Sequence, residues 1–198
     1  MTVGLLPNPA MDGPTGPTGP NANTTGPTGN AGATGPTGPS IKTTDVACFK
    51  YALPNNTNEV DSTPGAYVTR SLNTTVYNGI SGCSLSANQV TVPAGTYYVR
   101  VIAPTGIRST SPNQAGSHKA IVYDNTAGAN LVMGISHQNS DASSANPINH
   151  ALVQGSFTVS QSTTIKVLHR TSGSGTFGND MNFGDDEIYT TITFFRLA

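Results

Sequence analysis

Four histidines, His118, His137, His150 and His169, are the side chains best suited to metal binding or acid–base chemistry near neutral pH. No two of them are two or four residues apart, so the sequence lacks the usual spacing of a metal site. His118 and His169 fall in stretches with strand character, where we expect hydrogen-bonded structural roles. Because there is also no Gly-x-Ser-x-Gly elbow and no phosphate-binding glycine loop, the sequence predicts neither an enzyme nor a cofactor.

An acidic cluster near the C-terminus is the other candidate for chemistry. Asp180, Asp185 and Asp186, followed by Glu187, surround a glycine-containing loop and are weak candidates for a calcium site, since Ca²⁺ prefers oxygen ligands. Their spacing does not match an EF-hand loop. Two alternatives remain open, a solvated acidic loop and cross-strand ion pairs with arginines, for which the candidates are Arg70, Arg100 and Arg170.

The composition limits the kinds of partner that the chain can bind. The chain has 198 residues, 10% charged and 35% hydrophobic, with a formal net charge of −1. A near-neutral chain lacks the basic footprint of nucleic-acid binding, and no apolar run is long enough to insert into a membrane. Cys48 and Cys83 are too few for a disulfide framework, so we expect two free, mostly buried thiols.

Glycine recurs at every third position in residues 13–40. After a first block and a four-residue interruption, the repeat continues in register at Gly26, Gly29, Gly32, Gly35 and Gly38. The collagen triple helix requires this period, because every third residue points at a crowded axis with room only for hydrogen. The tract therefore predicts a stalk of three chains with these glycines on its axis; a flexible Gly/Pro/Thr linker is the alternative.

Residues 1–12 form a short lead that contains the apolar side chains Val3, Leu5 and Leu6. A detached apolar peptide before a stalk is suited to anchoring on a partner surface, whereas the alternative is a frayed terminus. The lead has no basic n-region, and its apolar run is short for a signal peptide, so we expect the chain to fold in a cytoplasm.

From residue 41 onward the sequence is typical of an all-β domain. Short runs rich in Val, Ile, Thr, Tyr and Phe alternate with Gly, Pro, Asn and Ser clusters. This pattern predicts an antiparallel jelly-roll sandwich over residues 41–198, which we call the head. The expected strands are 43–53, 66–77, 89–92, 96–103, 118–124, 131–137, 148–159, 164–170 and 187–197.

Two expected strands can be assigned by face. In 96–103, Tyr97, Val99, Val101 and Ala103 share one side, which we expect to face the core. In the last strand Ile188, Ile192 and Phe194 share one side, and Tyr189, Phe195 and Leu197 share the other. A strand that is apolar on both faces requires cover on both. We therefore place Tyr189, Phe195 and Leu197 at a trimer interface; a central strand under a long loop is the alternative.

The head also resembles a known group of proteins. It is similar to the C-terminal domain of many tailed-bacteriophage fibre proteins, and its Val-Pro-Ala-Gly-Thr-Tyr run resembles heads of the complement and tumour-necrosis-factor type. The similar segments cover nearly all of 66–198 and are centred on 70–78, 82–86, 90–97, 118–124, 155–159, 168–170 and 187–189. The resemblance implies a homotrimer of jelly rolls, often behind a collagen-like stalk.

These observations together predict a trimeric structural protein on the surface of a virion, assembled in the host cytoplasm. In this interpretation residues 1–12 bind a phage capsid or tail protein, and the head is displayed, with host glycans as its possible ligand. The short lead favours capsid decoration, or a head fibre, over a tail-fibre adhesin. A bacterial surface or spore collagen-like glycoprotein is the remaining non-enzymatic alternative.

Overall fold

The structure, a computed structural model, describes residues 42–107, 116–139, 148–173, 175–180 and 182–197. These residues belong to Ser40–Ala198, the second of two units into which the chain divides. The expected anchor (1–12) and stalk (13–40) lie outside the described residues and stay predictions.

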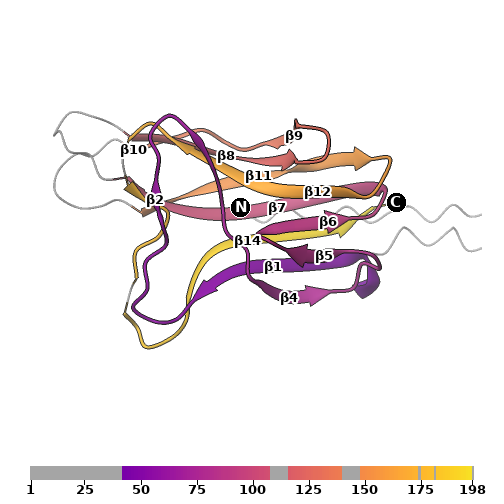
Figure 1. Ribbon diagram of the computed structural model, residues 1–198, viewed down its shortest axis with the longest axis horizontal. Coiled ribbons are helices and arrows are strands. Elements are labelled where there is room, and N and C mark those ends of the chain that lie inside the picture. The colour runs from indigo at the N-terminus through magenta and orange to yellow at the C-terminus, as the bar shows by residue number, and fades with distance from the viewer. Residues whose placement is uncertain (1–41, 108–115, 140–147, 174, 181, 198) are drawn as a thin grey trace, which may run out of the picture. The chain divides into compact units, whose positions relative to one another are not determined.

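The head consists of two antiparallel sheets, preceded by a short 3-10 turn, η1 (Thr43–Asp45) (Figure 1). Sheet A contains β1 (Val46–Leu53), β2 (Asp61–Ser62), β4 (Thr74–Asn78), β7 (Gly95–Ile107), β11 (Ile148–Val159), β13 (Gly175–Thr176) and β14 (Glu187–Arg196). Sheet B contains β3 (Tyr67–Thr69), β5 (Ser84–Ser86), β6 (Gln89–Val92), β8 (Gly116–Asp124), β9 (Ala129–Met133), β10 (His137–Asn139) and β12 (Thr163–Thr171).

The order of the strands is that of a jelly roll. In sheet A, β4, β1, β14, β7 and β11 follow one another, and β13 and β2 extend the sheet beside the end of β7. In sheet B, β5, β6, β12 and β8 follow one another, with β9 and β10 paired to β8 and β3 paired to β12. Successive long strands alternate between the sheets, β6 in B, β7 in A, β8 in B, β11 in A, β12 in B and β14 in A. The expected all-β jelly roll is therefore confirmed.

The core lies between the sheets and follows from alternation along the strands. Tyr97, Val99, Val101 and Ala103 of β7 are fully buried, as their shared face predicts. The Tyr97 ring lies 5.5 Å from the ring of Phe157 and 6.3 Å from that of Phe194, centroid to centroid. Burial of each large apolar side chain contributes roughly 1.5–3 kcal/mol, so this face is the main source of the head's stability.

Two expected strands are each divided in the structure. The segment 66–77 is wrong as a single strand, because β3 pairs with β12 in sheet B and β4 pairs with β1 in sheet A. The segment 131–137 ends its first strand at Met133, after which Gly134 donates to the carbonyl of Ala120 at 3.0 Å. A Cβ at Gly134 would lie 2.5 Å from that same oxygen, so the close passage of the backbone requires glycine.

The last strand departs from simple alternation. β1 pairs with β14 from Val46–Phe195 to Leu53–Glu187, but the register shifts between Tyr51 and Ala52, which leaves Tyr189 as an extra residue. The assignment of Tyr189 to the outward face is therefore wrong, since its side chain is only 4% exposed. The assignment of Ile188 to the face of Ile192 and Phe194 is also wrong, because Ile188 is 52% exposed.

The remaining expectations concern the thiols and the membrane. Cys48 and Cys83 are both free, as predicted, with Cys83 in the core and Cys48 half-buried. Cys48 Sγ accepts a hydrogen bond from the hydroxyl of Thr193 at 3.4 Å. Within the described ranges, no helix is long and apolar enough to cross a membrane.

Candidate functional site

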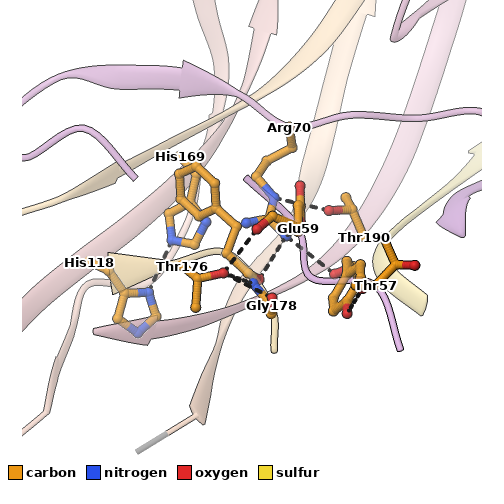
Figure 2. Close-up of polar contacts among 10 residues, drawn as sticks. Thr57, Glu59, Arg70, His118, His169, Thr176, Gly178 and Thr190 are labelled. Carbon is orange, nitrogen blue, oxygen red and sulfur yellow. Dashed lines mark hydrogen bonds and ion pairs between the residues drawn. The ribbon is translucent and has the colours of Figure 1, made fainter. Parts of the chain in front are cut away.

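A buried ion pair lies at one end of the sandwich. Arg70, the largest fully buried side chain in the described part of the chain, donates from Nη2 to Glu59 Oε2 at 2.6 Å (Figure 2). Its Nε donates to the hydroxyl of Thr190 at 3.0 Å. Nη2 also reaches the carbonyl oxygens of Phe177 at 3.3 Å and Tyr189 at 3.4 Å. The guanidinium thus binds three segments of the chain, around residues 59, 177 and 190.

Two of the segments around Arg70, those of Glu59 and Phe177, lie outside the expected strands. Strand β2 pairs with β13, and the amide of Glu59 donates to the carbonyl of Gly178 at 3.0 Å. The hydroxyl of Thr176 donates to the carbonyl of Glu59 at 3.1 Å. A Cβ at Gly178 would lie 1.9 Å from the ring of Tyr189, so only glycine fits here. Figure 2 shows Gly178 and Thr176 beneath the ion pair.

Burial changes the proton affinity of both partners. Burial raises the pKa of Glu59 to about 7, although the charge of Arg70 opposes that rise. Burial likewise lowers the pKa of Arg70 to about 10, against the charge of Glu59. Glu59 Oε1 and Arg70 Nη1 have no hydrogen-bond partner among the described residues. Desolvation therefore weakens both charges, and the carboxyl is the group of this pair that titrates nearest neutrality.

A row of rings continues from Arg70 to the surface. The guanidinium lies 4.3 Å from the ring centroid of Phe177, which stacks on His169 at 5.1 Å. His169 Nε2 and His118 Nδ1 are 3.2 Å apart, and the His118 ring stacks on His137 at 5.4 Å. The expected hydrogen bonding of His118 and His169 is confirmed, and their structural role stays a prediction. That they bond to each other could not be read from the sequence, because it depends on the pairing of β8 with β12.

Both buried histidines are held neutral. Burial, then the charges of Arg70 and His118, lower the pKa of His169 to about 2. Burial, then His137 and His150, lower the pKa of His118 to about 4. At neutral pH one ring therefore donates and the other accepts across the 3.2 Å contact. The pair stabilises the pairing of β8 with β12 in sheet B.

Among the described residues, the acidic candidates do not converge into a cluster of metal ligands. No group of three or more His, Cys, Asp or Glu side chains that could hold a metal ion occurs in the described ranges, the aspartates near residue 180 included. Asp185 and Asp186 are exposed, and the amide of Asp180 donates to the side chain of Asn58 at 2.7 Å. Of the three arginines considered as their partners, Arg70 pairs instead with Glu59.

An open pocket of about 470 Å³ lies next to the buried histidine pair. His118 is one of its walls, and the lining also includes Tyr67, Lys119, Arg170, Thr171 and Ser172. Sequence reasoning missed this site, because its residues come from β3, β8 and β12, which lie far apart along the chain. The cations, hydroxyls and one aromatic ring can bind a small polar ligand.

The outer face of sheet A carries paired aromatic and aliphatic side chains. Tyr98 and Phe195 lie directly opposite each other across β7 and β14, with ring centroids 6.3 Å apart. Ile102 and Leu152 are likewise paired across β7 and β11, and they line an apolar hollow of about 460 Å³ with Ile135. Of the three expected interface residues, Phe195 and Leu197 remain partly or mostly exposed and Tyr189 does not.

No protein-family model matches the sequence, and no curated protein matches it. Solved structures similar to the chain include the Eiger TNF from S. frugiperda, with a TM-score of 0.48, 15% identity, and coverage of 77% of this chain and 92% of that one. They also include murine APRIL at pH 5.0, with a TM-score of 0.46, 11% identity, and coverage of 77% and 99%. The jelly-roll assignment rests on this chain's own strand order.

Proposed function

We propose that this chain is the subunit of a homotrimeric structural protein on the surface of a bacteriophage particle. Residues 1–12 bind the particle, residues 13–40 form a collagen-like stalk, and the head is displayed for contact with the host surface. A tail-fibre adhesin with the same parts is the second candidate, supported by the resemblance of residues 66–198 to tailed-phage fibre heads.

The observation that carries the proposal is the strict glycine period immediately before a β-sandwich head. Five glycines from Gly26 to Gly38 keep the register, and a polyproline-type strand has no hydrogen bonds of its own. Such a tract needs two further strands to become ordered. A head that trimerises brings the three strands together and raises their effective concentration to roughly millimolar, which makes a short triple helix feasible.

The outer face of sheet A is suited to a second copy of the same chain. Tyr98, Phe195, Ile102 and Leu152 place aromatic and aliphatic side chains on this face without completely burying them. A sheet face of this kind is stabilised when another apolar surface covers it. The three-chain stoichiometry that the stalk requires makes two further heads the natural cover.

The stalk and the trimer are tested together on the purified full-length chain. We expect light scattering to give the mass of three chains, and circular dichroism to show a polyproline-type signal that is lost on warming. Gly32→Asp should remove that signal, because an axial side chain cannot fit, whereas the adjacent Ala33→Asp should keep it. A single-chain mass, or equal effects of both substitutions, contradicts the proposal.

Placement on the particle is tested by labelling intact virions with an antibody against the head. Label over the capsid supports decoration or a head fibre, and label at the tail supports the adhesin. Absence of the chain from purified particles rejects both and leaves a collagen-like glycoprotein of a bacterial surface or spore. A version without residues 2–12 should stay trimeric in solution and lose attachment.

A further inference from the structure

Lys119 and Arg170 face each other directly across β8 and β12. Their neighbours on these strands, His118, His169 and Thr171, are buried, so the two cations lie on the outer side of sheet B. Like charges directly opposite one another in a sheet are destabilising. In the described part of the chain neither cation forms an ion pair with a carboxylate. The two positive charges therefore form an uncompensated pair at the edge of the pocket.

The pocket supplies no negative charge either. Its lining consists of Lys119, Arg170, His118, a glycine, a tyrosine and four residues with hydroxyl groups, without an aspartate or glutamate. Arg170 lies 5.8 Å from the ring centroid of Tyr67, its direct partner on β3, and this contact favours a guanidinium directed over the ring. A guanidinium held in this way beside an ammonium is suited to a carboxylate or phosphate group.

Hydroxyl groups complete the lining and indicate what else the ligand carries. Ser117, Ser136 and Ser172 surround the cations, and Ser172 Oγ already accepts a bond from the amide of Ser117 at 2.7 Å, which leaves its proton to donate elsewhere. Short hydroxyl side chains match the donors and acceptors of a sugar. At about 470 Å³ the pocket lies in the range of small-molecule sites and is much larger than a bare anion needs.

Behind the pocket, the inner face of sheet B has unused hydrogen-bonding capacity. His118 and Thr171, which are also direct partners across β8 and β12, are 2% and 1% exposed. His118 Nε2 and Thr171 Oγ1 have no hydrogen-bond partner among the described residues. Buried polar atoms normally have partners, and these two atoms lie on the side of sheet B opposite to Lys119 and Arg170, so they are suited to a bound water and not to the ligand of the two cations.

From these features we infer that the pocket between Tyr67, Lys119 and Arg170 binds an anionic saccharide, a sugar unit that bears one carboxylate or phosphate group. Arg170 and Lys119 bind the anionic group, and the serine hydroxyls bind the sugar. This inference rests on the proposed function, since it names the class of host glycan that the head contacts. It concerns each head separately and does not require the trimer.

The test is calorimetric titration of the full-length chain with trigalacturonate, its methyl ester and glucose 6-phosphate. We expect at least one of the two anionic ligands to bind, and the uncharged ester to bind about tenfold more weakly than trigalacturonate or not at all. Affinity for the anionic ligand should fall as NaCl rises from about 50 to about 300 mM, because salt screens the charges. Trigalacturonate binding assigns the carboxylate source, and glucose 6-phosphate binding without it assigns the phosphate source.

Substitutions locate the site. Arg170→Gln and Lys119→Gln should each weaken binding about tenfold, the loss expected for one charge-assisted hydrogen bond. Lys166→Gln is the matched control, because Lys166 is on the same strand and face and lies 5.6 Å from the ring centroid of Tyr123. It should leave binding unchanged. Thermal melts of all three variants verify folding.

Four results would overturn the inference. They are failure of both anionic ligands to bind, insensitivity to Arg170→Gln and Lys119→Gln, an equal loss with Lys166→Gln, and equally tight binding of inorganic phosphate alone. Light scattering on the same samples separates this inference from the proposed function. A trimer without saccharide binding rejects the pocket alone, and saccharide binding by a single-chain species rejects the trimer alone.

Discussion

Glu59 and Arg70 meet at 2.6 Å in the interior of the head, although the residues between them form β2 and β3, which belong to different sheets. The carboxylate and the guanidinium are 1% and 0% exposed, so the contact lies within the protein. This pair closes the end of the sandwich that carries the pocket.

Removal of one member of the pair should destabilise the head strongly. Glu59→Gln leaves Arg70 buried without a counter-charge, a change that typically costs about 3–5 kcal/mol. Asp61→Asn, at an exposed site two residues away, should change the free energy of unfolding by less than about 0.5 kcal/mol. Urea unfolding measures both. The double substitution Glu59→Leu with Arg70→Met should be less destabilising than Glu59→Gln. A double variant whose loss of stability equals the sum of the losses of Glu59→Leu and Arg70→Met alone would contradict a coupled pair.

The buried histidines should make the head sensitive to acid. The pKa values of His169 and His118 in the folded head, about 2 and about 4, lie below the ordinary value of 6.5. The unfolded chain therefore binds more protons below pH 6.5, and stability is lost as the pH falls from 6.5 toward 4. Glu59, whose pKa is raised to about 7, acts in the opposite direction between pH 4.5 and 7. The net effect is a loss of up to about 1.4 kcal/mol per pH unit.

Replacement of one histidine checks the source of this loss. His118→Gln lowers by one the number of protons that the unfolded chain binds in excess of the folded head. Urea unfolding between pH 4.5 and pH 7 should therefore show a nearly flat stability profile. His150→Gln, at an exposed site, removes only the smallest of the three causes of the lowered His118 pKa, so it should leave the slope close to that of the unsubstituted chain. An unchanged slope in His118→Gln would show that other groups control the acid sensitivity.

Gly178 should not tolerate a side chain. The Cβ of Gly178→Ala would lie 1.9 Å from the ring of Tyr189, so the ring or the backbone must move, at a cost of about 1–3 kcal/mol or more. Tyr189→Ala removes the obstructing ring and should be destabilising by itself. If the clash is the cause, Gly178→Ala should cost much less in the Tyr189→Ala background. Equal costs in both backgrounds would assign the effect to the backbone of Gly178.

Phe195 should contribute to trimer assembly through the outer face of sheet A. Phe195→Asp places a charge beside Tyr98 on that face, so the measured mass should shift from three chains to one. Ile188→Asp is the control, since Ile188 is 52% exposed near the start of the same strand and outside that aromatic pair. Light scattering distinguishes the two, and a trimer that survives Phe195→Asp at micromolar concentration would place the interface elsewhere.

Sequence reasoning recovered the features that depend on local alternation. Strands β6 and β11 have the predicted bounds, and the inward face of β7 is the predicted one, because a two-residue period fixes which side chains share a face. Tyr189 was misplaced because one extra residue in β14 breaks that period. Nothing in the local pattern around residue 189 marks the bulge.

The candidate functional site depends on strand pairing, which a single sequence does not show. Glu59 lies in a stretch with the composition of a loop, and its burial follows from the pairing of β2 with β13. His118 and His169 become neighbours through the register of β8 and β12, and the same register brings Lys119 opposite Arg170. None of these contacts can be predicted before the order of the strands is known.

The full-length pairing of β1 with β14 has a mechanical consequence. The chain enters the head at the Val46 end of β1, next to Phe195, and β10 lies toward the other end of the sandwich (Figure 1). The pocket lies at that other end, because Ser117 in its lining pairs with Gln138 of β10. A pull between the entry point and a ligand held in the pocket is directed along β1. The hydrogen bonds of β1 to β14 and β4 would then bear the load in shear, all at once, instead of opening one after another. A head built in this way can resist tension along its long axis.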